Sequence, residues 1–195
     1  MHFRPAFIVV AASCLIATPA SADETEDHIK TIRAQYAAIE AVGTKGEEIK
    51  FEAEGDPLSG TLTRFRKDGQ MVKAVLSYTS GDHGGSDERF YYRDGKLFFI
   101  HVTDSSWKFG GKPASNGQPG TIDEVTEHRI YLHDGKVIRN LTKTASAESG
   151  EDLAKALAKA ENKAPVDRER ETAVLSHASA LPGLKDAAAI LKMME

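Results

Sequence analysis

Three times in this chain an alternating, aromatic-bearing run meets the dipeptide Asp-Gly and continues as another apolar run. The dipeptides are Asp68-Gly69, Asp94-Gly95 and Asp134-Gly135. Asp-Gly between alternating segments is a strong hairpin signal, because both central residues of a type I′ turn need positive φ, which Gly adopts freely and Asp tolerates. The pattern therefore predicts three β-hairpins.

The segment before the hairpins has a different period. Residues 24–42 place Ile29, Ile32, Tyr36 and Ile39 at three- and four-residue spacing, which is typical of a helix with one buried face. Residues 48–53 then alternate, which predicts a first strand. With the three hairpins this gives an α+β fold, in which an N-terminal helix packs on an antiparallel sheet of about seven strands.

The turns also predict how the strands pair, because residues equidistant from a two-residue turn face each other. The outer predicted pairs are Phe65–Val72, Tyr91–Phe98 and Tyr131–Ile138, and the inner pairs are Arg66–Met71, Tyr92–Leu97 and Leu132–Val137. Hairpin two is apolar on both faces, so we expect it at the centre of the sheet. Hairpin one carries Arg64, Arg66 and Lys73, which we expect to lie in solvent near an edge.

The composition changes after Lys143 to Ala-rich segments over residues 151–162, 167–181 and 184–194, with a Pro182-Gly183 break. These segments predict helices, and the little bulk of Leu153 and Leu157 indicates loose docking on the sheet. We therefore divide the chain into a leader (1–22), an α+β hairpin domain (23–144) and a helical tail (145–195).

The leader has the features of a bacterial signal peptide. Arg4 precedes an apolar stretch over residues 6–17, and Ala20-Ser21-Ala22 offers the small residues that a signal peptidase accepts, so we expect cleavage near Ala22. Processing as a lipoprotein at Cys14 is the alternative. No later segment has the roughly 20 apolar residues of a spanning helix. The sequence thus predicts a periplasmic or secreted protein.

Charge and cysteine content narrow the function classes. The net charge of −4 argues against a nucleic-acid partner. Cys14 is the only cysteine and would be lost with the leader, so the mature chain has no disulfide, thiolate nucleophile or cysteine metal ligand. The histidine spacing matches no metal-ligand pattern, and we expect no cofactor.

Two loops contain the candidate site residues. Residues 80–87 join hairpins one and two and contain Asp82, His83 and Asp87, which are either a weak metal or active-site cluster or part of a plain connector. Residues 104–120 are too long for a tight connection, and Trp107 and Phe109 at its start are candidates for contact with a ligand or partner. The alternative is that they close the end of the core. The basic set Arg64, Arg66 and Lys73 is a further candidate binding surface.

The stretch from Ile32 to Lys143 resembles an uncharacterised family of bacterial exported proteins and lipoproteins with repeated Tyr-x-x-Asp-Gly-Lys hairpins. The likeness rests on Glu88-Arg-Phe-Tyr-Tyr-Arg-Asp-Gly-Lys-Leu-Phe-Phe-Ile-His-Val and Glu127-His-Arg-Ile-Tyr-Leu-His-Asp-Gly-Lys-Val-Ile-Arg. Asn140 stands where that family typically has Trp. The resemblance implies the fold and export, and no catalytic residue.

No catalytic constellation accompanies this strong structural repeat. A nucleophile needs a base that a third group holds in place, and no such set is indicated. We therefore expect an exported, non-catalytic binding or structural protein with an unknown protein or small-molecule partner. The alternatives are a metal-dependent enzyme or carrier that uses the His83 loop, and an accessory protein or inhibitor of another exported enzyme.

Overall fold

A computed structural model describes residues 22–43, 45–113, 117–148, 151–163 and 166–195. The predicted leader and the Cys14 alternative therefore lie outside the described residues, apart from Ala22. The elements in chain order are α1 Ala22–Glu40, β1 Gly46–Glu52, β2 Leu58–Lys67, β3 Gln70–Ser80, β4 Gly84–Arg93, β5 Lys96–Phe109, β6 Thr121–His133, β7 Lys136–Glu148, α2 Leu153–Lys159, α3 Arg168–Ala180, the 3-10 helix η1 Leu181–Gly183, and α4 Ala187–Met194.

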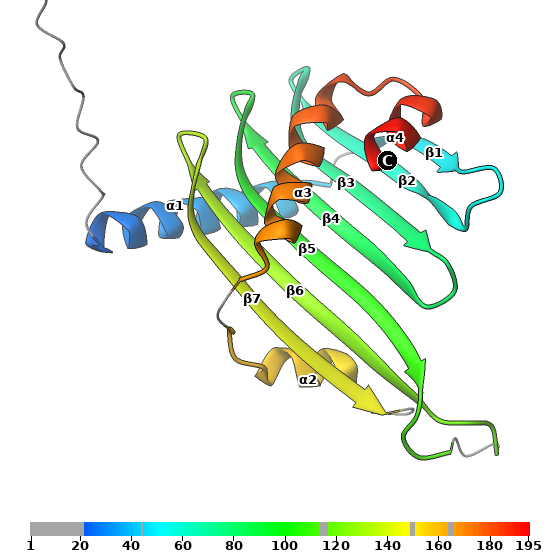
Figure 1. Cartoon of the computed structure of the whole chain (residues 1–195). Helices are drawn as coiled ribbons and strands as arrows, with labels where there is room; N and C mark the ends of the chain where they lie inside the picture. The colour runs from blue at the N-terminus through cyan, green and yellow to red at the C-terminus, as the bar shows by residue number, and fades with distance from the viewer. Residues whose placement is uncertain (1–21, 44, 114–116, 149–150, 164–165) are drawn as a thin grey trace, which may run out of the picture.

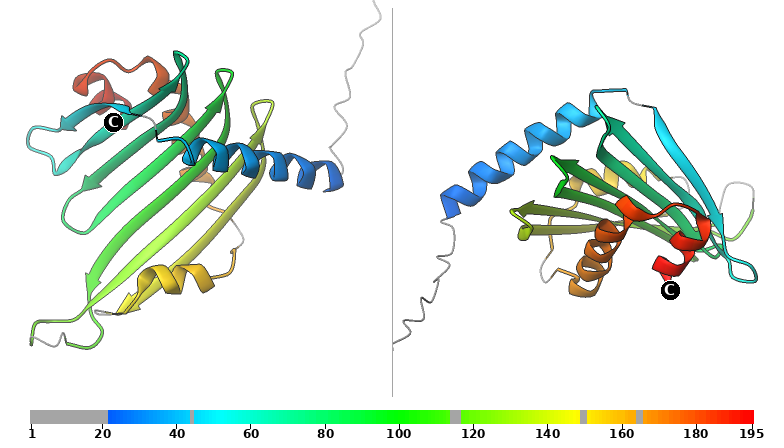
Figure 2. Two further views of the ribbon diagram at one scale, coloured as in Figure 1. Left: turned by 180° about the vertical axis from the view of Figure 1, so that it is seen from behind. Right: turned by 90° about the horizontal axis from the view of Figure 1, so that it is seen from above.

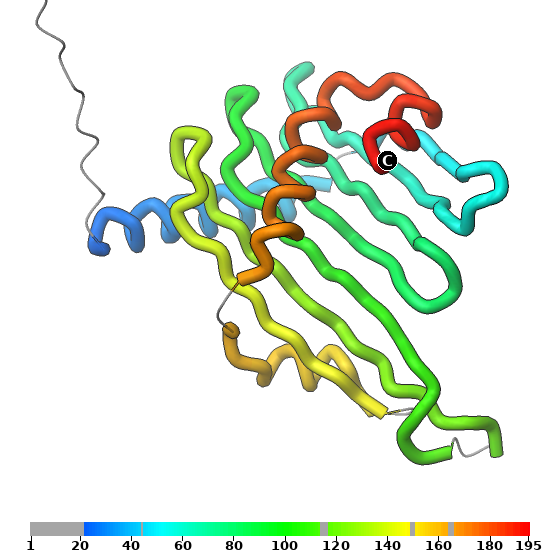
Figure 3. The backbone as a smooth tube through the Cα atoms, in the orientation of Figure 1, coloured from blue at the N-terminus to red at the C-terminus, as the bar shows by residue number. Residues whose placement is uncertain are grey.

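The strands form one antiparallel meander in the order β1 to β7 (Figure 1). Figure 3 shows the same path as a continuous tube that runs up and down the sheet. The predicted α+β class is confirmed, and so is the central position of hairpin two, which is β4 and β5. No helix among the described residues has both the length and the apolar character that crossing a membrane requires.

Each predicted Asp-Gly turn joins two strands with both residues at positive φ. The φ angles are 51° and 79° at Asp68-Gly69, 50° and 73° at Asp94-Gly95, and 45° and 74° at Asp134-Gly135. These values fit the type I′ geometry that the sequence predicts.

The strand pairing is correct next to each turn and wrong one step further out. The inner pairs Arg66–Met71, Tyr92–Leu97 and Leu132–Val137 are confirmed, but the outer partners are Phe65–Lys73, Tyr91–Phe99 and Tyr131–Arg139. Each hairpin carries a bulge at the same place, with Val72, Phe98 and Ile138 as the extra residues. A bulge adds one residue to a single strand and increases the local twist. Counting equal distances from the turn therefore fails there.

The face of the sheet that α1 covers has an aromatic core. Ile29 and Ile32 of α1 are buried against Tyr91 of β4, Phe99 of β5 and Tyr131 of β6. Their rings pack at centroid distances of 5.6 Å for Tyr91–Phe99 and 5.0 Å for Phe99–Tyr131. The helix crosses this face close to the hairpin turns (Figure 2), so the rest of the face is not under α1.

The opposite face is covered by α3, η1 and α4 (Figure 2). Val174, Leu181 and Ile190 from these elements are fully buried in the larger core, and the Tyr92 hydroxyl donates to the carbonyl of Ala178 at 2.9 Å. The expectation of loosely docked C-terminal helices is thus wrong for α3 and α4. It fits α2 alone, which buries none of its residues.

Two connections are shorter than the sequence predicts. Strand β5 continues through residues 104–109, so the long connection covers only residues 110–120. Strand β4 begins at Gly84, which leaves Gly81, Asp82 and His83 as a tight turn between hairpins one and two. Both differences bring predicted loop residues into regular strands, where their side chains point to a defined face.

Candidate binding face

Strand register arranges the chemistry of the α1 side in rows across the sheet. Under α1 lies an aromatic row, the next row carries charges, and the two rows beyond carry hydroxyl groups. The rows are Phe65, Lys73, Tyr91, Phe99 and Tyr131; then Thr63, Val75, Arg89, His101 and Arg129; then Thr61, Ser77, Asp87, Thr103 and Glu127; then Ser59, Thr79, Gly85, Ser105 and Val125. We call the part of this side between α1 and α2 the open face. A shallow depression of about 450 Å³ lies over its hydroxyl rows.

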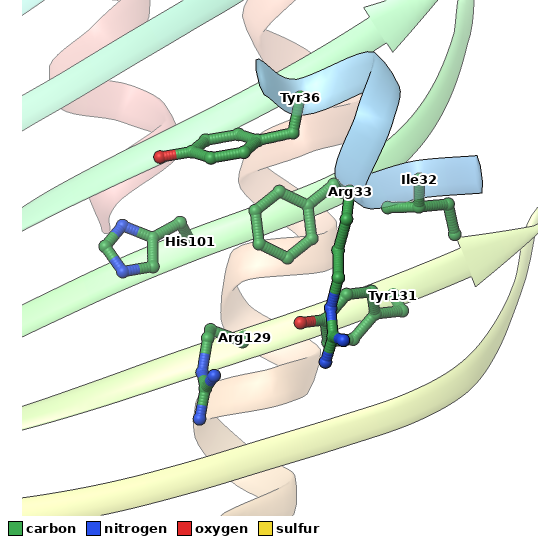
Figure 4. Close-up of a pocket in the computed structure, with 7 residues that line it drawn as sticks. Ile32, Arg33, Tyr36, His101, Arg129 and Tyr131 are labelled. Atoms are coloured by element: carbon green, nitrogen blue, oxygen red, sulfur yellow. The ribbon is translucent and has the colours of Figure 1, made fainter. Parts of the chain in front are cut away.

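A smaller and more enclosed pocket of about 160 Å³ lies at the edge of α1 (Figure 4). It is lined by Ile32, Arg33, Tyr36, Phe99, His101, Arg129 and Tyr131. Helix α1 supplies the first three residues, and strands β5 and β6 supply the others. We call this cavity the α1 pocket.

Aromatic rings form the walls of the α1 pocket. The Tyr36 ring meets Tyr91 at a centroid distance of 5.1 Å and Phe99 at 5.4 Å, both edge to face. Edge-to-face contacts between aromatic rings are favourable, so they stabilise the positions of these rings. The walls are therefore preformed and largely apolar.

Charged groups surround one carboxylate beside this pocket. Three nitrogen atoms lie close to the Glu127 carboxylate oxygens: His101 Nε2 at 3.2 Å, Arg129 Nε at 3.1 Å and Lys143 Nζ at 3.4 Å. The hydrogen bond from His101, together with both cations, holds the pKa of Glu127 below its usual range despite burial. Arg129 also donates to the Asn162 side chain at 2.7 Å. These groups pair by charge and shape the pocket rim, and Arg129 Nε is buried without a hydrogen bond of suitable geometry.

Three polar groups of the α1 pocket have no such partner. Within the described ranges, the Arg33 guanidinium forms no ion pair and lies 5.9 Å from the centre of the Tyr131 ring. The hydroxyl groups of Tyr36 and Tyr131 likewise meet no hydrogen-bonding side chain or carbonyl among those residues. Figure 4 shows the Tyr36 hydroxyl directed toward His101 and Arg33 alongside Tyr131. Polar groups at the surface of a pocket are the usual contacts for a ligand.

The two predicted loop candidates come together at the far end of the open face. Trp107 Nε1 donates to the Asp82 carbonyl at 2.7 Å, and the Trp107 ring lies 4.1 Å from the His83 ring and 5.2 Å from Phe109. Phe109 is 68% exposed. The structure thus joins into one aromatic cluster residues that the sequence analysis treats separately.

The predicted metal candidates do not converge. Asp87 receives hydrogen bonds from Ser77 and Arg89, whereas Asp82 and His83 are in the turn beside Trp107. Within the part of the chain that the structure describes, no group of three His, Cys, Asp or Glu side chains is arranged to hold a metal ion.

The basic candidates of hairpin one are only partly in solvent, contrary to expectation. Arg66 is exposed, but Arg64 is buried and donates to the Leu184 carbonyl at 2.6 Å and to Glu47 at 3.1 Å. Lys73 Nζ lies 2.7 Å from Glu40 of α1. Arg64 therefore connects the sheet to the segment between η1 and α4, Lys73 connects it to α1 on the opposite face, and the two are not a common binding surface.

A buried polar cluster under α3 is a feature that the sequence analysis missed. Arg170 bonds to Glu88 at 2.8 Å and to both oxygens of Asp104 at 2.7 and 2.9 Å. His177 Nδ1 also lies 2.8 Å from Glu88, and His128 Nε2 lies 3.5 Å from Asp104. Glu88 alternates with buried Phe90 along β4, and this was the available signal that it faces inward. We call this set the α3 cluster.

The α3 cluster predicts a stability that depends on pH. Burial alone raises the pKa of Asp104, but hydrogen bonds from His128 and Arg170 outweigh it and hold the pKa far below its usual range. Because the folded pKa is depressed, this contribution is present above the unfolded pKa of about 4 and is lost as pH falls through lower values. We expect urea denaturation to show Asp104→Asn less stable than wild type at pH 7, with a smaller difference at pH 3. An equal difference at both pH values would contradict this assignment.

Comparison with protein-family models, with curated proteins and with solved structures finds no match to this chain. The resemblance read from the two hairpin segments therefore stays a prediction, and the site must be interpreted from its own geometry.

Proposed function

We propose that the protein is exported and acts by binding, without catalysis, and that its ligand occupies the open face with one part in the α1 pocket. The observation that carries this proposal is the set of unpartnered polar groups on Arg33, Tyr36 and Tyr131 around a preformed aromatic cavity. Ligand pockets combine apolar walls with a few polar groups that fix the orientation of the ligand, and these three groups are available for that role.

Two further observations support this proposal. The sequence of residues 1–22, with Arg4, an apolar stretch and Ala20-Ser21-Ala22, supports export. The acidic and basic groups of the open face are engaged with each other, as Asp87 is with Arg89 and Glu127 is with Lys143. Such pairs suit a rigid binding surface better than a proton-transfer site, in which the base must be free to reach the substrate.

The α1 pocket is tested with small ring compounds and an amide-resolved NMR spectrum of protein purified from cells that express the full chain. The panel is benzyl alcohol, benzamide and benzoate. We expect at least one of them to shift amide signals of α1, β5 and β6 around Tyr36, Phe99 and Tyr131. The variant Tyr36→Ala removes one wall and should abolish these shifts.

The matched control is Lys30→Ala, an exposed position on the same helix. It should bind the panel as wild type does. If no compound, charged or neutral, shifts signals around the α1 pocket, or if Tyr36→Ala binds unchanged, the pocket is not a binding site.

A further inference from the structure

The size and walls of the α1 pocket define the body of its ligand. Its volume of about 160 Å³ is close to that of an engineered cavity, about 150 Å³, that accepts benzene. Three of its seven lining residues are aromatic, and Ile32 adds an aliphatic wall. A single flat ring fits this volume and offers edges and faces to the surrounding rings.

The charges around the pocket define the polar end of the ligand. Arg129 and Lys143 already share Glu127, so one carboxylate meets two permanent cations and the His101 imidazole. Arg33 adds another cation at the mouth, with no carboxylate of the described residues within ion-pair distance. This local excess of positive charge, on a chain with a net charge of −4, favours an anionic ligand.

The hydrogen-bonding groups favour a carboxylate in particular. The planar guanidinium of Arg33 matches a carboxylate through two parallel N–H···O bonds. The phenol groups of Tyr36 and Tyr131 are available as O–H donors and would satisfy oxygens that Arg33 leaves free.

We infer that the α1 pocket takes an aromatic carboxylate, with the ring against Phe99 and Tyr131 and the carboxylate on Arg33. The inference rests on the proposed function and specifies its ligand class. Arg33 is exposed on α1 and its side chain approaches the Tyr131 ring, so it can close over a bound ring by a rotamer change without movement of the helix.

The test compares benzoate with benzamide, which has the same ring and nearly the same shape without the charge. By titration calorimetry on the full-chain product, we expect benzoate to bind at least tenfold more tightly, because a hydrogen bond to a charged partner is worth about that factor. The variant Arg33→Gln should lose about tenfold in affinity for benzoate and leave benzamide unchanged. Arg66→Gln, which removes an exposed arginine on hairpin one, should change neither affinity.

Equal affinities for benzoate and benzamide, or unchanged benzoate binding by Arg33→Gln, would overturn the inference while leaving the pocket as a site for neutral rings. Loss of benzoate binding in both Arg33→Gln and Arg66→Gln would also overturn it, because a general effect of net charge would then explain the affinity. If no ring compound binds at all, the proposed function itself is contradicted. Failure of the carboxylate inference and failure of the proposed function therefore give different results.

Discussion

Replacing Arg170 by methionine is expected to lower the free energy of unfolding by about 3 kcal/mol. The reason is the Glu88 carboxylate, which is fully buried and lies 2.8 Å from Arg170 Nη1. Removing the cation leaves a buried charge without its strongest partner. The loss falls at the lower end of the range for broken buried pairs, because Tyr78 and His177 still contact Glu88.

Arg168→Met is the matched control for this experiment. Arg168 lies one half-turn earlier on α3, its side chain is 72% exposed, and it pairs with Glu171 at 2.8 Å. Arg168 itself is exposed, and Glu171 keeps its hydrogen bond from Asn140, so we expect a change below about 0.5 kcal/mol in urea denaturation. If both variants lose the same free energy, the α3 cluster is not what holds α3 to the sheet.

A double variant distinguishes the cost of the unpaired Glu88 carboxylate from the cost of the lost Arg170 packing. Arg170→Met combined with Glu88→Gln removes the stranded carboxylate but keeps the size of the side chain and its ability to accept hydrogen bonds. We expect it to be more stable than Arg170→Met alone. A double variant less stable than the single one would mean that Glu88 stabilises the fold through contacts other than Arg170.

Much of the fold could be predicted from local chemistry. Asp-Gly fixes the three turns because few other dipeptides adopt positive φ twice, and the apolar faces of hairpin two place it at the centre. The bulges at Val72, Phe98 and Ile138 could not be predicted in this way. Each bulge adds one residue to a single strand, and a count of residues from the turn assumes that no such residue is present.

The expectation that the C-terminal helices dock loosely is wrong because it considers only the size of their apolar side chains. Helix α3 buries Val174 and Ala178, which are small, and much of its remaining attachment is through Arg170 and His177. Both polar residues look like surface positions in a sequence. Only the alternation of Glu88 with Phe90 indicates a buried carboxylate that would need them.

The α1 pocket was missed for a different reason. Its residues come from one helix and two strands, and each looks ordinary alone: Ile32 and Tyr36 belong to an amphipathic helix face, and Tyr131 belongs to a hairpin. The pocket exists because α1 crosses the sheet near the turns and covers the aromatic row, while the neighbouring charged row is left uncovered. That crossing is a property of tertiary packing. The Trp107 cluster, in contrast, was anticipated in its residues although not in its contact with His83.

Replacing Leu181 by alanine is expected to destabilise the protein by about 3 kcal/mol, as large-to-small changes in a packed core do. Leu181 is fully buried in η1, in the same core cluster as Leu76, Phe90 and Ile190. The truncation would leave a cavity between the sheet and the connection from α3 to α4. A tail that docks loosely would instead relax around the change and lose little.

Leu157→Ala provides the comparison on α2, a helix without buried residues, and should cost less than about 1 kcal/mol. Guanidinium denaturation, followed by both far-ultraviolet circular dichroism and Trp107 fluorescence, distinguishes a tail that unfolds with the sheet from a tail that docks loosely. Because α3, η1 and α4 share the core of the sheet, we expect both signals of Leu181→Ala to shift together to lower denaturant in a single transition. An early loss of helical signal ahead of the fluorescence change would mean that the tail unfolds independently of the sheet. In that case the burial of Leu181 would contribute to the docking of the tail rather than to one cooperative fold.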